Sequence, residues 1–123
     1  MATRETFTSN RLCIELIDGD DVVLLQWRGR SDDREPGQFL VPLMVSALQR
    51  CAGGARPLVM DFTAVEYMNS SSFSPLARLL ERSAQGNDRV RLEYSQARAW
   101  QRLSFSALKA FETRDGRICV HGQ

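Results

Sequence analysis

The chain has 123 residues, 43% of them hydrophobic, and its sixteen basic and fifteen acidic residues leave a net charge of +1. This length suits a single domain over residues 1–123, and the near-neutral charge gives no indication of a nucleic-acid-binding protein. The one histidine, His121, lies near the C-terminus, whereas proton shuttles and typical metal sites usually need histidine inside the fold. We therefore expect no catalytic residues, no metal site and no cofactor.

Cysteine usage and hydropathy bear on the compartment. Cys13, Cys51 and Cys119 are odd in number and too widely spaced for a CxxC pair, which favours a reducing compartment over a disulfide framework. Each lies in an apolar run, so we expect all three to be core residues. The first ten residues lack the apolar segment of a signal peptide, and no run approaches the roughly 18 apolar residues of a membrane span. These features predict a cytoplasmic protein with no membrane span.

The first predicted elements are two strands. Apolar residues alternate with polar ones over 11–17, as in a half-buried strand, and a second apolar strand follows over 22–27. The turn over 18–21 contains three aspartates. We interpret it as a solvated hairpin loop rather than a cation site, because no further spaced ligands complete a calcium loop. Residues 29–37 are polar and predict a longer loop.

A helix is predicted over 37–51, because apolar residues recur there at helical spacing and Gly53 follows. The nearly continuous apolar run over 57–62 predicts a central strand that is covered on both faces. After a polar loop over 65–73, a second helix is predicted to end at Ala84. Its apolar residues are Phe73, Leu76, Ala77, Leu80 and Ala84, and its solvent side carries Arg78, Glu81, Arg82 and Gln85.

The last predicted elements are a strand over 89–94, a helix over 97–111 and a short strand over 117–120. The third helix is expected to bury Trp100, Leu103, Ala107, Leu108 and Phe111. The full order is β-β-α-β-α-β-α-β, and its strand-helix-strand units require a mostly parallel or mixed sheet with helices packed on it. We therefore predict one α/β domain.

The loop between the central strand and the second helix is the main candidate site. Asn69 is followed by Ser70, Ser71 and Ser72 at the carboxyl end of a strand, where open α/β sheets meet ligands and partners. Any of these four side chains can cap the helix by accepting a backbone hydrogen bond. A cap needs only one of them. The residues alone leave open whether the run is a plain cap or a modified or partner-contacting site.

A phosphate on one of these hydroxyls is compatible with a folded domain. It would add about −1.5 to −2 charges at neutral pH, and a helix N-terminus typically stabilises an anion by about 0.3–1 kcal/mol. The phosphate would instead alter the surface that a partner binds, where a new desolvated or like charge can cost several kcal/mol of binding free energy.

Residues 58–73, with the sequence LVMDFTAVEYMNSSSF, resemble the core signature of STAS domains, the anti-sigma factor antagonist family. In that signature a hydrophobic strand carrying an aspartate precedes an Asp-Ser-Ser-Gly-Leu motif that opens a helix. The resemblance continues through the helix to Ala84 and the strand over 89–94, and the remainder of the chain matches by element order. Residues 100–104, WQRLS, also resemble a bacterial subgroup of STAS-like regulators.

This resemblance implies a STAS-like fold and a non-enzymatic regulatory switch. In such proteins a serine kinase, often an anti-sigma factor, phosphorylates the motif, a PP2C-type phosphatase reverses the modification, and the unmodified form binds its target kinase, anti-sigma factor or signalling enzyme. Matched by position, the phosphoacceptor falls on Ser71, with Ser70 as second choice. The implied partner-binding residues are Asn69, Ser70, Ser71, Ser72, Phe73 and Asp61. For Asp61, a strand-end carboxylate bonded to a loop is the alternative.

Three residues depart from the family motif. Asn69 replaces the usual aspartate, Ser72 replaces the glycine, and Pro75 falls in the first helical turns. These departures permit a second function, that of a constitutive STAS scaffold or subunit, for example of a lipid-transport complex, without phosphorylation. An enzyme or nucleotide-binding protein ranks last, because no GxSxG, P-loop or zinc motif occurs.

The charge is unevenly distributed along the chain. Residues 67–123 contain nine basic and five acidic residues, whereas residues 1–66 contain seven and ten. The basic side chains on the later predicted helices are Arg78, Arg82, Arg98 and Arg102. They are interpreted as a solvated helix face or as a surface that guides an acidic partner.

Overall fold

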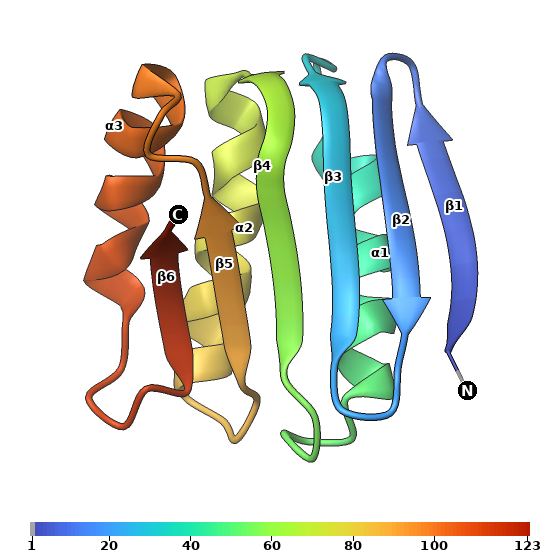
Figure 1. The fold of residues 1–123 in the computed structure, drawn as a ribbon, viewed down its shortest axis with the longest axis vertical. Helices are drawn as coiled ribbons and strands as arrows, with labels where there is room; N and C mark the ends of the chain where they lie inside the picture. The colour runs from blue at the N-terminus through green and yellow to red at the C-terminus, as the bar shows by residue number, and fades with distance from the viewer. Residues whose placement is uncertain (1) are drawn as a thin grey trace.

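The computed structural model describes residues 2–123, which form a mixed six-stranded sheet and three α-helices (Figure 1). The strands are β1 (Thr3–Ser9), β2 (Leu12–Asp18), β3 (Val23–Ser31), β4 (Leu58–Met68), β5 (Val90–Tyr94) and β6 (Ile118–Gly122). The helices are α1 (Gly37–Arg50), α2 (Ser70–Ala84) and α3 (Ala99–Leu108), which continues into the 3₁₀ turn η1 (Lys109–Phe111). The predicted α/β class with a mixed sheet is confirmed.

The strand order places all the helices on one face of the sheet. The strands lie side by side in chain order, with β1 to β3 antiparallel and β3 to β6 parallel. Each helix connects two neighbouring parallel strands, so every crossover moves across the sheet in the same direction, from β3 toward β6. Because such crossovers are right-handed, successive helices must cover the same face. In Figure 1, α1 and α2 lie behind the sheet and α3 lies at its β6 side.

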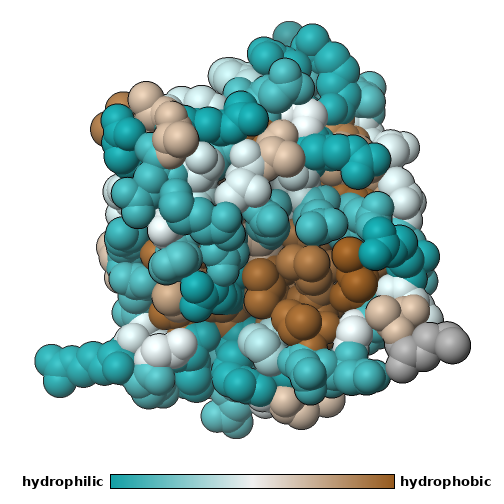
Figure 2. Space-filling model, viewed as in Figure 1, coloured by the Kyte–Doolittle hydropathy of each residue, from teal (hydrophilic) through white to brown (hydrophobic). Residues whose placement is uncertain are grey.

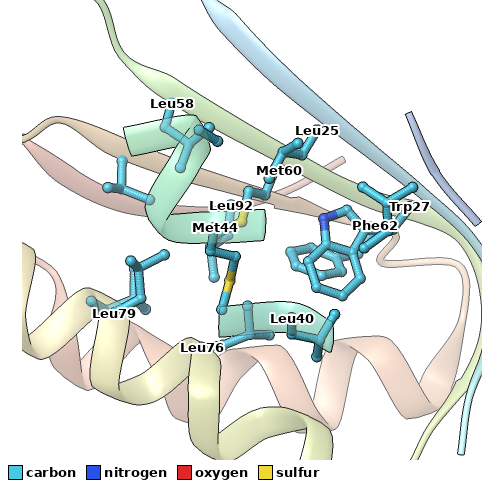
Figure 3. Packing of buried hydrophobic residues seen from close by; sticks show 14 of the residues in the cluster. Leu25, Trp27, Leu40, Met44, Leu58, Met60, Phe62, Leu76, Leu79 and Leu92 are labelled. Carbon is cyan, nitrogen blue, oxygen red and sulfur yellow. The ribbon is translucent and has the colours of Figure 1, made fainter. Parts of the chain in front are cut away.

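The core fills the space between the sheet and the helices. Trp27 from β3 packs against Phe62 from β4 with ring centroids 4.6 Å apart, and Phe62 is 4.8 Å from Phe105 of α3. Leu40 and Met44 of α1 close this layer, as Figure 3 shows. Burial of each such side chain stabilises the fold by about 1.5–3 kcal/mol, which makes this layer the main source of stability.

The other face of the sheet is open to solvent. Figure 2 shows it as largely hydrophilic, with a hydrophobic patch. Ile17, Leu24 and Val59 are register neighbours on β2, β3 and β4, and all three are partly exposed. Cys13 and Cys119 are also only partly buried, so the expectation that every cysteine is a core residue holds for Cys51 alone.

The structure adds one strand to the predicted order and lengthens another. β1 is mostly exposed and polar, with only Phe7 packed against the core, so it carries no apolar alternation. β4 extends to Met68, which corrects the predicted end at Phe62 and the predicted loop over 65–73. Register shifts in the pairing of β3 with β4 bring Phe62, Val65 and Met68 inward at intervals of three residues, and this spacing hides the strand.

The predicted inner face of the third helix is partly wrong. Leu103 is 73% exposed, and Ala107 is exposed as well. The buried side chains of α3 are Gln101, Phe105 and Leu108. The polar side chain of Gln101 therefore occupies a core position, whereas the apolar side chain of Leu103 lies on the solvent side of the helix. None of the helices within residues 2–123 has the length and apolar character needed to cross a bilayer.

Candidate functional site

The serine run lies at the junction of β4 and α2. β4 ends at Met68, Asn69 is the N-cap with extended backbone, and Ser70 is the first helical residue. β3 is the parallel neighbour of β4, and the backbone amide of Asn69 donates to the carbonyl oxygen of Ser31 at 2.9 Å. The run is therefore fixed at the carboxyl ends of two neighbouring parallel strands.

Asn69 supplies the cap that the sequence leaves open among four residues. Its Oδ1 accepts from the backbone amide of Ser72 at 3.0 Å, as an N-cap side chain does for the third helical residue. Its Nδ2 donates to the carbonyl oxygen of Asp33 at 2.8 Å. An aspartate, the usual residue of the resembled motif, would keep the first bond and lose the second. Asparagine thus joins the helix start to the loop after β3.

Ser72 belongs to the interior. It is fully buried, and its Oγ lies 2.7 Å from Oγ of Ser31 and 2.6 Å from Oδ1 of Asn69. The Ser31 hydroxyl can donate to Ser72 while Ser72 donates to Asn69, so the chain of bonds is satisfied. The expectation that Ser72 contributes a side chain to a partner surface is therefore corrected. Ser72 stands where the resembled motif has glycine, and its side chain points inward to form these hydrogen bonds.

Ser70 and Ser71 occupy the first two positions of α2 and are both exposed. Within residues 2–123, neither hydroxyl has a hydrogen-bond partner. The backbone amides of Ser70 and Ser71 also lack intrahelical acceptors, because the helix begins there. The four-residue run therefore divides into two residues that build the junction and two whose hydroxyls face solvent beside free amide groups.

Phe73 and Asp61 make their contacts with other residues than this pair. Phe73 is partly buried, and its ring packs edge-on against Phe105 with centroids 5.4 Å apart. Asp61 lies within β4 rather than at its end, and its Oδ1 accepts from the amide and the hydroxyl of Thr63. The structure therefore does not bring Asp61 together with Ser71. The alternative of a strand-end carboxylate bonded to a loop is wrong as well, because Thr63, which donates to Asp61, belongs to the same strand.

Pro75 is the sixth residue of α2 and is buried. At this position a backbone amide would bond to the carbonyl of Ser71, so the proline removes one intrahelical hydrogen bond from the first turns. The carbonyl of Ser71 consequently has no such donor. The first turn depends more strongly on the Asn69 cap and the buried Ser72.

The loop after β3 places acidic side chains next to the junction, and each is already paired. Asp32 forms an ion pair with Arg11, and Asp33 accepts from Ser9 and Asn10. Arg30 lies over the ring of Tyr67, 4.8 Å from its centroid, and Tyr67 is 41% exposed. The Arg11 ion pair reduces the repulsion that Asp32 would exert on an added anion at α2, whereas Asp33 has neutral partners and keeps its charge.

Sequence reasoning missed the residues that support this junction. Ser31 and Asp33 lie in a segment interpreted only as a polar loop, and Gln101 lies in the WQRLS segment, which the sequence distinguishes only by its family resemblance. Gln101 is fully buried, and its Nε2 donates to the carbonyls of Phe62 and Val65 at 2.7 and 2.9 Å. Gln101 thereby satisfies the carbonyls at the irregular part of β4. Its helix also contains Arg102, Ser104 and Ser106, so no apolar pattern marks Gln101 as a buried residue.

The groups with shifted pKa values lie elsewhere. Hydrogen bonds from Arg56 and Arg50 hold the pKa of Asp18 below its usual value, and Asp18 lies at the opposite end of the sheet from Asn69. Burial raises the pKa of Cys51 to about 11. Among residues 2–123, no group of three or more His, Cys, Asp or Glu side chains is arranged to hold a metal ion.

Comparison with known proteins shows a shared fold. The chain resembles the crystal structure of apo-SiaC from Pseudomonas aeruginosa with a TM-score of 0.67, and the match covers 98% of each chain. The two sequences are 19% identical. The sequence matches no protein-family model and no curated protein. The SiaC structure therefore supports the α/β arrangement described above, over nearly the whole chain.

Proposed function

We propose that this protein is a non-enzymatic regulator of the STAS type, which binds a protein partner and is switched by phosphorylation of Ser71. Ser70 is the second candidate acceptor. The observation that carries this proposal is the division of the serine run: Asn69 and Ser72 fulfil the structural tasks, whereas Ser70 and Ser71 are exposed and unbonded. Helix capping alone gives no reason for the two exposed hydroxyls.

The geometry supports a phosphate that changes the surface without unfolding the domain. A phosphate on Ser71 would lie within the first turn of α2, where free amides and the helix dipole favour an anion by about 0.3–1 kcal/mol. The Ser31 to Ser72 contact lies beneath this turn and does not involve either exposed hydroxyl. The modification would thus act mainly on affinity for a partner.

The partner classes follow from the resemblance in the sequence. A serine kinase, such as an anti-sigma factor, would attach the phosphate, and a PP2C-type phosphatase would remove it. The unmodified protein would bind its target through the surface around the start of α2. The reducing compartment expected from the cysteines suits such a partner set.

A constitutive scaffold is the second candidate function. Ser72 and Pro75 favour it, because both depart from the resembled motif within a few residues of the acceptor. In a scaffold, the exposed serines would be ordinary surface residues. Substituting them with aspartate would then leave partner binding unchanged.

The experiment that separates these two functions is affinity capture from the source cells with four baits. Wild type, Ser71→Ala, Ser71→Asp and Ser106→Asp are compared by quantitative mass spectrometry, and Ser70→Asp is tested in parallel. Ser106 is an exposed serine on α3, so its variant controls for net charge. We expect Ser71→Asp to lose a partner by about tenfold, since a like charge at an interface costs several kcal/mol. Equal recovery by all baits supports the scaffold.

A further inference from the structure

A groove lies between α1 and α2 and starts near the serine junction. One hollow of about 260 Å³ is lined by Val41 and Val45 of α1 and by Pro75 and Leu79 of α2. A second hollow of about 300 Å³ shares Val45 and Leu79 with the first and continues toward Asp88. We call these two connected hollows the α1–α2 groove.

The α1 wall of the groove exposes apolar side chains. Val41 is 42% exposed and Val45 is 37% exposed, although both lie on a helix whose other face fills the core. They are separated by four residues and therefore lie on one side of the helix, one turn apart. Large apolar side chains exposed in a hollow are typical of a surface that a partner covers.

The α2 wall carries an unpaired positive charge. Arg78 and Arg82 both line the groove, are exposed, and are four residues apart on the same side of α2. Within residues 2–123, neither guanidinium forms an ion pair or a hydrogen bond with another residue. Asp88 is the acidic residue that lines the groove, at its far end. The apolar part is therefore flanked by two available cations.

We propose that the α1–α2 groove binds an acidic amphipathic helix of a different protein. α1 and α2 both connect parallel strands, so they run side by side in the same direction, and a third helix can pack into the groove between them. Its apolar side chains at helical spacing would contact Val41, Val45 and Leu79. Its acidic residues would face Arg78 and Arg82.

The chain's own helices do not provide such a ligand. α1 and α3 contain no acidic residue, and α2 contains Glu81 between Arg78 and Arg82. A helix from a second copy would therefore bring no acidic surplus to the groove. Charge complementarity assigns the occupant to a partner protein.

This docking site rests on the proposed function for its regulation. Ser71, Pro75, Arg78 and Arg82 follow the spacing of one side of α2, so Ser71 lies at the N-terminal end of the wall that carries the arginines. A phosphate there would place negative charge next to the acidic helix and about 10 Å from Arg78 along the axis, given the rise of α2. The modification would weaken docking by repulsion.

In-cell photo-crosslinking tests the proposal. The photoreactive residue p-benzoylphenylalanine replaces Val45 in the full chain expressed in its source cells, and the same replacement of Leu103, which is 73% exposed on α3, serves as the control. The crosslinked peptide is then sequenced. We expect an adduct at position 45, absent at position 103, to an amphipathic segment rich in Asp and Glu. The combined Arg78→Glu and Arg82→Glu variant should reduce it by about tenfold or more.

Contradictory results are equally specific. No adduct at position 45, an adduct to a second copy, an adduct to a neutral or basic segment, or an adduct insensitive to the arginine reversals would each overturn the docking site. The Ser71→Asp background separates this proposal from the switch. An acidic-helix adduct that persists unchanged in that background supports the docking site and contradicts only the phosphorylation switch.

Discussion

Ser31 and Ser72 meet in the interior with their hydroxyl oxygens 2.7 Å apart. Ser31 ends β3 and Ser72 lies in the first turn of α2, so this contact connects the end of one strand to the helix that follows its neighbour. The same turn exposes Ser70 and Ser71. The candidate acceptors therefore lie in a helical turn that is hydrogen-bonded to the neighbouring strand, rather than in a loop.

Removing the Ser72 hydroxyl should destabilise the protein. In Ser72→Ala, the buried hydroxyl of Ser31 loses its partner, so we expect the free energy of unfolding to fall by about 1–3 kcal/mol. Ser83→Ala is the matched control, because Ser83 has a buried hydroxyl that lacks a hydrogen-bond partner among residues 2–123. That change should be neutral or stabilising. Urea denaturation measures both, and equal losses in the two variants would disprove the role of the Ser31 contact.

The cap should depend on Asn69 rather than on the exposed serines. Asn69→Ala removes an acceptor for the amide of Ser72 and a donor to Asp33, so we expect a loss of about 1–2 kcal/mol of stability. The double variant Ser70→Ala, Ser71→Ala should change stability by less than about 0.5 kcal/mol. Thermal unfolding at fixed pH compares them. A larger loss in the double variant would show that a serine caps the helix.

The three thiols should differ in reactivity. Burial raises the pKa of Cys51 to about 11, so at about pH 8 only about one thiol in a thousand is a thiolate. Cys13 and Cys119 are partly exposed on the open face of the sheet. We expect iodoacetamide to label these two in the native protein and Cys51 only after unfolding. Rapid native labelling of Cys51, located by peptide mass spectrometry, would contradict its burial.

Asp18 should make stability depend on pH. The Arg56 and Arg50 hydrogen bonds lower the pKa of Asp18 in the folded state, so its contribution is present above the unfolded value of 3.8 and is lost as pH falls through the lower folded value. Asp18→Asn should therefore cost about 1–2 kcal/mol near neutral pH. The difference from wild type should shrink below about pH 4. Asp21→Asn, exposed in the same turn, is the control, and a pH-independent Asp18→Asn difference would refute this account.

The predictable parts of the fold are those where apolar spacing follows one period. The helix starting at Gly37 and the strand starting at Val90 show this, since each buries the residues that the pattern selects. The strand continuing to Met68 was not predictable, because its register shifts break the alternation after Phe62. The prediction of the buried face of α3 failed for another reason. Gln101 is buried and forms hydrogen bonds to β4, and hydrophobic patterning does not detect such bonds.

The candidate site shows the same division. The position of the serine run at a strand-to-helix junction follows from the order of elements along the chain. Which serine is buried depends on Ser31, forty-one residues earlier in the chain, and no local pattern reports such a long-range contact. The separation of Ser72 from Ser70 and Ser71 therefore required the three-dimensional structure.

The central claim is that Ser71 or Ser70 carries a regulatory phosphate, and phosphosite mapping of protein purified from its source cells tests it most directly. Because the unmodified chain has a net charge of +1, one phosphate would reverse its sign, so native electrophoresis should separate two forms. We expect tandem mass spectrometry to place the phosphate of the faster-migrating anionic form on Ser71 or Ser70. We also expect PP2C treatment to remove it. A single unmodified form under all growth conditions, or phosphate confined to other residues, would contradict the claim.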